Sequence, residues 1–148
     1  MAVTRERLYE FMNAHKLAVL ATVAMDGSPQ AAVMGIAVTP ELEVIFDTLR
    51  STRKYRNLRT NPRVAFVIGG EGEVTVQYEG IAEEPADAEL HACKKAYFAK
   101  WPDGPQREHW PGMTYIRVRP AWIRYSDFNE ASREIAEMTF DAAAGQGA

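Results

Sequence analysis

The strongest constraint on the fold comes from short stretches in which apolar and polar residues alternate. In residues 73–84, Val74, Val76 and Tyr78 alternate with polar neighbours, and this period of two places them on one face of a strand. Residues 42–48 and 63–69 show the same alternation. Short alternating segments of this kind predict an antiparallel, mainly β domain.

Further strands are predicted on both sides of these segments. Residues 17–25 and 30–38 are mostly apolar and flank the Asp26-Gly27 pair, which is a strong hairpin signal. Near the end of the chain, residues 113–120 and 121–126 read as two strands separated by Pro120. The expected total is six or seven strands.

Four segments have helical patterns. Thr4 is a candidate N-cap for an amphipathic helix that ends near His15. The other predicted helices cover residues 51–62, 85–101 and, at the end, 129–140.

The chain of 148 residues has the size of one domain, which we expect to span residues 1–140 before a disordered tail at 141–148. A net charge of -3 does not favour nucleic acid or an anionic membrane as a partner. A single cysteine, Cys93, excludes an internal disulfide. No apolar run has the length of a membrane span, and no signal peptide is recognisable, so we expect a cytoplasmic protein.

The one strong local charge feature is the basic segment, defined as residues 50–63. It holds six of the 17 basic residues of the chain, although the protein is acidic overall. Ser51 and Thr52 precede Arg53 and Lys54 where the helix is expected to start, and free backbone N–H groups there favour an anion. The segment therefore predicts an anion site. The alternative is a solvated helix face whose arginines pair with acidic residues elsewhere.

Other reactive combinations are weak. The three histidines are scattered, and Cys93 among helical apolar neighbours is expected to be a buried core residue. No clustered ligands indicate a metal site. Tyr55 and Leu58 are expected in the core beneath the basic helix. The chain offers no identifiable catalytic residues, so in an enzyme the chemistry would belong to a cofactor.

The order of these parts resembles the FMN-binding split-barrel family related to pyridoxamine 5'-phosphate oxidase. The resemblance rests on the early hairpin, residues 51–54, the Asn61-Pro62-Arg63-Val64 stretch and the strand ending at residues 78–82. It implies a six-stranded antiparallel Greek-key split barrel with a few flanking helices. It also implies a homodimer with FMN at the subunit interface.

The resemblance assigns cofactor contacts by position. Thr52, Arg53 and Lys54, with Ser51 beside them, would hold the flavin phosphate, and a late strand of the partner chain would approach the cofactor. The remaining implied contacts are Val33, Met34, Gly35, Ile36, Asp47, Thr48, Thr75, Gln77 and Trp122.

Two departures from the family pattern bear on function. Ala31 and Ala32 stand where the oxidases carry an arginine that reaches the phosphate, and the C-terminal substrate-binding arginine and histidine pattern is absent. These differences weigh against true pyridoxamine phosphate oxidase activity. The sequence leaves the substrate and the electron donor open.

Three functional hypotheses follow. The first is an FMN-dependent oxidoreductase of unknown substrate. The second is a deazaflavin-dependent reductase on the same fold, with Arg56 and Arg59 receiving a longer acidic tail. The third is a non-catalytic flavin- or haem-binding protein, in which His15 or His91 would be an axial ligand for haem.

Overall fold

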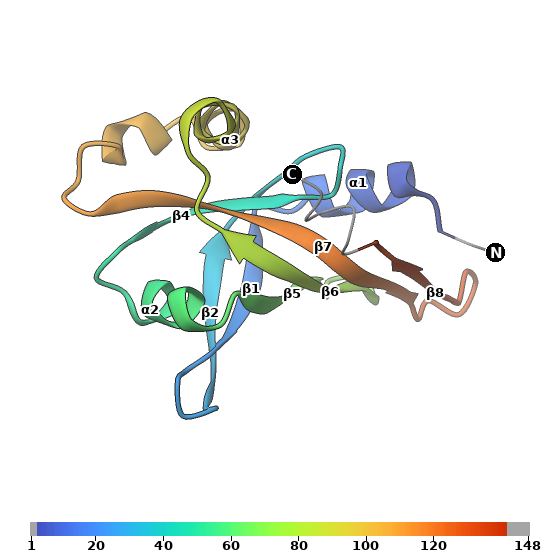
Figure 1. The fold of residues 1–148 in the computed structure, drawn as a ribbon. Helices are drawn as coiled ribbons and strands as arrows, with labels where there is room; N and C mark the ends of the chain where they lie inside the picture. Colours follow the sequence, from blue (N-terminus) through green and yellow to red (C-terminus); the bar gives the residue numbers. More distant parts are fainter. Residues whose placement is uncertain (1–2, 142–148) are drawn as a thin grey trace.

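The computed structural model describes residues 3–141, which form one antiparallel sheet and three α-helices (Figure 1). The strand order is β2-β1-β5-β6-β7-β4-β3, and β8 pairs with the second half of β7. The strands are β1 (Leu17–Val23), β2 (Pro29–Gly35), β3 (Ala37–Val38), β4 (Val44–Leu49), β5 (Arg63–Gly69), β6 (Val74–Glu83), β7 (Met113–Asp127) and β8 (Glu134–Thr139). Residues 142–148, most of the predicted tail, lie outside the described part.

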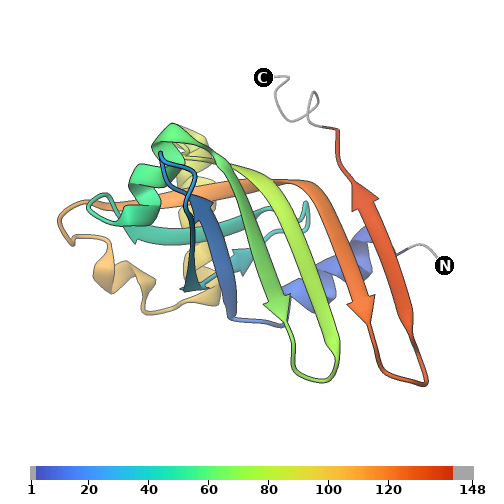
Figure 2. The same ribbon diagram turned by 90° about the horizontal axis from the view of Figure 1, so that it is seen from below.

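The sheet curls around its core, as Figure 2 shows, so the expected mainly β split-barrel class is confirmed. It has eight strands, where the pattern predicted six or seven and the resemblance implied six. The extra elements are the two-residue β3 and the terminal β8.

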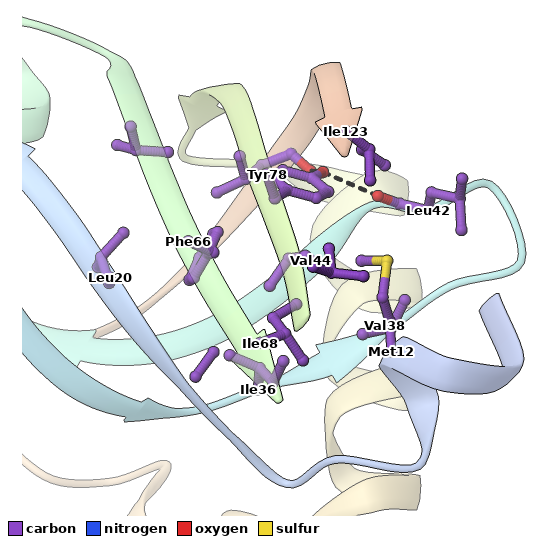
Figure 3. Packing of buried hydrophobic residues seen from close by; sticks show 14 of the residues in the cluster. Met12, Leu20, Ile36, Val38, Leu42, Val44, Phe66, Ile68, Tyr78 and Ile123 are labelled. Carbon is purple, nitrogen blue, oxygen red and sulfur yellow. Dashed lines mark hydrogen bonds between the residues drawn. The ribbon is translucent and has the colours of Figure 1, made fainter. Parts of the chain in front are cut away.

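The alternating residues of the sequence fill the inside of the curl. Phe66 and Tyr78 are buried and meet edge to face, with ring centroids 5.7 Å apart. The Tyr78 hydroxyl donates to the Leu42 carbonyl at 2.8 Å and lies 3.1 Å from the Val118 carbonyl (Figure 3). This buried hydroxyl is therefore satisfied where β4 and β7 approach β6.

The helices are α1 (Arg5–Asn13), α2 (Arg53–Thr60) and α3 (Asp87–Lys100). The predicted N-cap of α1 is confirmed, because Thr4 Oγ1 accepts a hydrogen bond from the Arg7 N–H at 3.1 Å. In Figure 1, α2 lies below the sheet beside β2, whereas α3 lies above β4 and β7. A short 3-10 helix (Gly104–Arg107) follows α3.

The prediction of two strands separated by Pro120 was wrong, because β7 runs through it. Gly80 of β6 is opposite Pro120, and Glu79 is opposite Trp122, so Ala121 is an extra residue in a bulge. A proline is tolerated there because the ladder is already interrupted. Gly80 leaves the space that the bulge needs, since a Cβ on it would collide with the Arg119 carbonyl.

The predicted last helix was also wrong. Asn129 begins a turn in which its carbonyl accepts hydrogen bonds from the N–H groups of Ser132 and Arg133, and β8 then pairs with β7. Ala136 and Met138 of β8 pack against the core. The good helix formers of this segment are overridden because pairing with β7 covers its apolar face.

The outer face of the sheet, opposite the core, carries several exposed apolar side chains. Val33, Val19 and Val67 are neighbours in register across β2, β1 and β5, and Gln77 and Arg124 continue the same row on β6 and β7. Val33 is 64% exposed and Val67 is 47% exposed. Leu17 and Ile81 are also exposed.

Candidate functional site

The start of α2 is fixed by the side chain of Thr52. Its hydroxyl donates to the Leu49 carbonyl at 2.9 Å and accepts from the Tyr55 N–H at 3.3 Å, which makes Thr52 the N-cap. The Thr48 hydroxyl lies 3.1 Å from the Thr52 hydroxyl. Arg53 and Lys54 thus become the first two helical residues, whose N–H groups have no partner within a helix.

A groove of about 450 Å³ separates this helix start from the first hairpin. Its walls come from β1, β2 and the residues around the start of α2: Leu20, Thr22, Gln30, Ala31, Ala32, Ser51, Thr52, Arg53 and Lys54. Within residues 3–141, the side chains of Arg53 and Lys54 make no hydrogen bond or ion pair. The structure therefore brings the four predicted anchor residues together in one groove with two unpaired cations.

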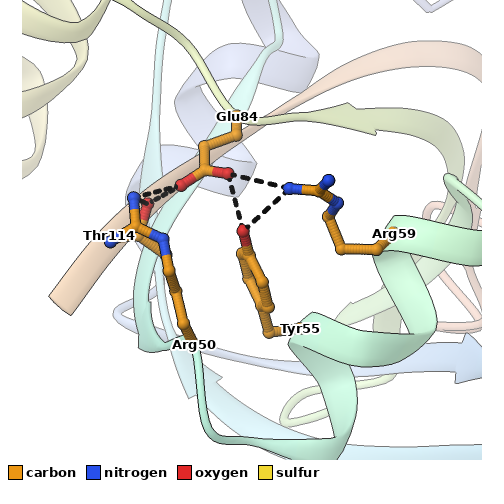
Figure 4. A network of polar contacts seen from close by, with 5 residues as sticks. All are labelled: Arg50, Tyr55, Arg59, Glu84 and Thr114. Atoms are coloured by element: carbon orange, nitrogen blue, oxygen red, sulfur yellow. Dashed lines mark hydrogen bonds and ion pairs between the residues drawn. The ribbon is translucent and has the colours of Figure 1, made fainter. Parts of the chain in front are cut away.

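Glu84, just beyond β6, binds other residues of the basic segment (Figure 4). Its carboxylate accepts hydrogen bonds from Arg50 Nη2 at 2.7 Å and from the Tyr55 hydroxyl at 2.9 Å, and Arg59 lies at 4.0 Å. The Thr114 hydroxyl also donates to it. The alternative interpretation of the segment, arginines paired with acids, thus holds for Arg50 and Arg59.

The pKa of Glu84 reflects this environment. Burial raises it, but the hydrogen bonds from Thr114, Tyr55 and Arg50 outweigh burial and hold the pKa below its ordinary value. Glu84 is thereby kept ionised, and the buried side of α2 stays tied to the sheet. Tyr55 and Leu58 are buried beneath the helix, as expected.

Asn57 was not predicted as a site residue, and it is 7% exposed on the buried side of α2. Its Nδ2 donates to Thr22 Oγ1 at 3.0 Å and to Gln30 Oε1 at 2.8 Å, so one amide joins α2 to β1 and β2. The only signal for it in the sequence is its position between Tyr55 and Leu58, the apolar residues of the helix.

Residues 33–35 complete β2 beyond the groove, and Ile36 follows the strand. Gly35 packs under Trp101, and a Cβ on Gly35 would lie 2.8 Å from Trp101 Cζ2. The carbonyl of Ile36 accepts from Trp101 Nε1 at 2.9 Å, and its N–H donates to the Lys16 carbonyl. Close packing against Trp101 explains why residue 35 is a glycine. The N–H and carbonyl of Ile36 both already have hydrogen-bond partners within the chain. Met34 packs on the core, whereas Val33 faces outward.

Asp47 belongs to a separate polar group beneath α3. Its carboxylate accepts from the Tyr97 hydroxyl at 3.1 Å and from Arg107 Nε at 3.3 Å. Burial, together with the charge of Asp47, raises the pKa of Tyr97 well above its ordinary value. Asp47 was predicted to contact the cofactor, but its side chain already binds Tyr97 and Arg107.

Three more predicted contacts lie on the outer face of the sheet. Gln77 is in the row of Val67 and Arg124, and Trp122 is the register partner of Glu79 on the next row. Trp122 Nε1 donates to Glu137 at 2.8 Å. Thr75 is two residues before Gln77 on the same strand. Within a single chain, Thr75, Gln77 and Trp122 therefore lie outside the groove beside the start of α2.

A metal site and a reactive cysteine both lack support in residues 3–141. The described residues contain no group of histidine, cysteine, aspartate or glutamate side chains placed to hold a metal ion. Cys93 is buried in a small cluster with Tyr97, as expected, and burial raises the pKa of its thiol. Among these residues, no helix is long and apolar enough to cross a membrane.

The curled antiparallel sheet is a half-barrel, and the basic start of α2 lies across a groove from the first hairpin. These features place the chain in the class of split-barrel proteins. The family model of pyridoxamine 5'-phosphate oxidase matches residues 4–127, so the chain belongs to this family. The chain is 35% identical over 121 residues to a pyridoxine/pyridoxamine 5'-phosphate oxidase from Rubrobacter xylanophilus. That match covers 81% of this chain and 51% of the relative, so the chain spans about half of its length.

Solved structures with the same fold have diverse descriptions. A haem-binding protein from Mycobacterium smegmatis superposes with a TM-score of 0.79 at 18% identity, over 94% of this chain and 59% of that one. The haem storage protein HutZ from Vibrio cholerae superposes with a TM-score of 0.69 at 18% identity, over 81% and 91% of the two chains. At these identities the likeness shows the fold alone.

Proposed function

We propose that this chain is an FMN-binding oxidoreductase whose groove holds the flavin phosphate. The observation that carries the proposal is the division of charges along the basic segment. Glu84 engages Arg50 and Arg59, whereas Arg53 and Lys54 line the groove without a partner in residues 3–141. Two cations left unpaired beside a helix start favour binding of an anion.

The donors of the groove fit a phosphate. Arg53 offers a planar fork of N–H groups, Lys54 offers an ammonium group, and Ser51 adds a hydroxyl. Thr52 acts indirectly, since its hydroxyl caps the helix and orients the first N–H groups. Bound FMN would supply hydride and electron transfer, while the chain would bind and orient it.

The outer face supports a homodimer as part of the proposal. Exposed valines in register on three adjacent strands form an apolar surface of the kind that interfaces bury. A second copy on this face would cover Val19, Val33 and Val67. It would also give the outward-facing Gln77 and Trp122 a route to the cofactor of the partner subunit.

The test is an absorption spectrum of the purified protein, followed by titration with FMN and with riboflavin, which lacks the phosphate. We expect a flavin spectrum, or its appearance on adding FMN, and much weaker binding of riboflavin. A protein that stays colourless with excess FMN contradicts the proposal. Equal affinity for the two flavins contradicts the phosphate anchor.

A non-catalytic binding role is the second candidate. The observation in its favour is that the residues lining the groove include no carboxylate, histidine or cysteine to move a proton. The haem-binding descriptions of two structural neighbours extend this candidate to haem. Steady oxidation of reduced nicotinamide by the FMN-loaded protein would exclude it. Tighter binding of a deazaflavin than of FMN would instead favour a deazaflavin-dependent reductase.

A further inference from the structure

Gln30 shares the groove with the helix start and lies on the inner side of β2. It is the register partner of Thr22, and two residues further on Ala32 is the partner of the buried Leu20. Gln30, Ala32, Thr22 and Leu20 all line the groove. The second strand therefore presents one long polar side chain toward the region that residues 51–54 enclose.

The orientation of the Gln30 amide is set by Asn57. One hydrogen of Asn57 Nδ2 goes to Thr22 Oγ1 and the other goes to Gln30 Oε1. With its oxygen held in this way, Gln30 keeps both Nε2 hydrogens available, and they have no partner within residues 3–141. Thr22 Oγ1 is an acceptor in this arrangement, so its own hydrogen is also left to donate.

We propose that the carboxamide of Gln30, oriented by Asn57, is a neutral hydrogen-bond donor to the anion in the groove. This inference rests on the proposed function. Ala31 and Ala32 offer no donor side chain, so Gln30 is the residue of β2 able to reach the anion from the side opposite Arg53 and Lys54. Asn57 is a positioning residue, because it acts through Gln30.

A neutral donor has a consequence that a cation would not have. It contributes a directed hydrogen bond to the phosphate without adding to the positive charge of the groove. The salt dependence of FMN binding should then come from Arg53 and Lys54 alone, because salt screens the attraction between charges.

The experiment compares Gln30→Met and Gln30→Glu with the wild-type protein in FMN and riboflavin titrations, followed by flavin fluorescence. Gln30→Met keeps the length of the side chain and removes both amide groups. Gln30→Glu keeps an acceptor for Asn57 and replaces the donor by a negatively charged oxygen, so it should fold even where Gln30→Met is unstable. We expect FMN affinity to fall roughly tenfold or more in each variant, with little change for riboflavin.

The matched control is Gln106→Met, since Gln106 is an exposed glutamine on the 3-10 helix after α3. It should bind FMN as the wild type does. Wild-type protein that binds no FMN would overturn the proposed function itself. Wild-type binding with unchanged affinity in Gln30→Glu would overturn only the role of Gln30.

A gain-of-function variant adds an independent readout. Gln30→Arg places a guanidinium on the second strand, beside the same anion. FMN affinity should rise, and its dependence on salt concentration should become steeper than in the wild type. An unchanged salt dependence would show that residue 30 does not reach the phosphate.

Discussion

The Tyr55 hydroxyl donates a hydrogen bond to Glu84 Oε1 at 2.9 Å, and this contact fixes the buried side of α2 to the end of β6. The other carboxylate oxygen receives Arg50 Nη2 and the Thr114 hydroxyl. Glu84 thus joins the loop before α2, the helix itself and the start of β7. The position of the helix start depends on a residue that does not line the groove.

Replacing Glu84 by alanine should destabilise the protein by about 1–3 kcal/mol, because Tyr55 and Thr114 lose their acceptor. Equilibrium unfolding in urea measures the change. Tyr55→Phe is the matched control, since it removes one donor and should cost about 1 kcal/mol. A loss no larger in Glu84→Ala than in Tyr55→Phe would show that Glu84 is not the centre of the network.

The ionisation of Glu84 predicts a dependence of stability on pH. Its pKa is held below the ordinary value of 4.5, so the folded state favours the charged form. The resulting stabilisation is complete above the unfolded pKa and is lost as the pH falls through the lower, folded pKa. The free energy of unfolding should therefore fall less steeply with acid in Glu84→Gln than in the wild type. Parallel curves for the two proteins would refute this.

Tyrosine burial predicts an effect at the other end of the pH scale. Burial and nearby negative charge raise the pKa of Tyr115 to about 12, above its ordinary value of 10.0. A raised folded pKa stabilises the protein below the unfolded pKa, and this stabilisation is lost as the pH rises toward the folded value. Tyr115→Phe should reduce the alkaline loss of unfolding free energy. The check is denaturant unfolding at a series of alkaline pH values.

The phosphate anchor predicts a specific loss of binding. Changing Arg53 and Lys54 together to alanine should weaken FMN binding by a few kcal/mol, since hydrogen bonds to charged groups contribute about 1.5–3 kcal/mol each. Arg63→Ala is the control, because Arg63 begins β5, has an exposed side chain and does not line the groove. Equal losses in the double variant and the control would indicate a general charge effect.

The apolar outer face predicts the assembly state. Val67→Glu places a charge at the centre of the row formed by Val19, Val67 and Gln77, and it should convert a dimer to a monomer in light scattering. Met25→Glu introduces the same charge at an 86% exposed position in the hairpin turn and should leave the dimer intact. A wild-type monomer at high concentration would contradict the interface.

The sequence predicted the parts of the fold that local patterns determine. Alternation located β5 and β6, and the helix containing Tyr55 and Leu58 was placed correctly with its buried side. The errors at Pro120 and in residues 129–140 involve the bulge and the pairing of β8, both of which depend on a partner strand distant in the sequence. Local propensity carries no information on such partners.

The candidate site shows the same division. Residues 51–54 were proposed as an anion site because of their types and order, and the structure places them together in one groove. Asn57 and Glu84 could not be found, because their roles depend on contacts that the fold creates between distant segments. No local pattern indicates that Asp47 binds Tyr97 and Arg107, which lie far from it in the chain.

The continuation of β7 through its bulge has a mechanical consequence. Residues 113–118 of β7 pair with β4, residues 117–127 pair with β6, and residues 122–127 also pair with β8, so one strand joins three others. Separating β4, β6 or β8 from one another requires breaking a ladder with β7, and each ladder is formed by its own run of backbone hydrogen bonds. The barrel should therefore behave as a rigid frame whose amides exchange with solvent together. The first hairpin and α2 lie at its margin, where a ligand could enter without unfolding the whole.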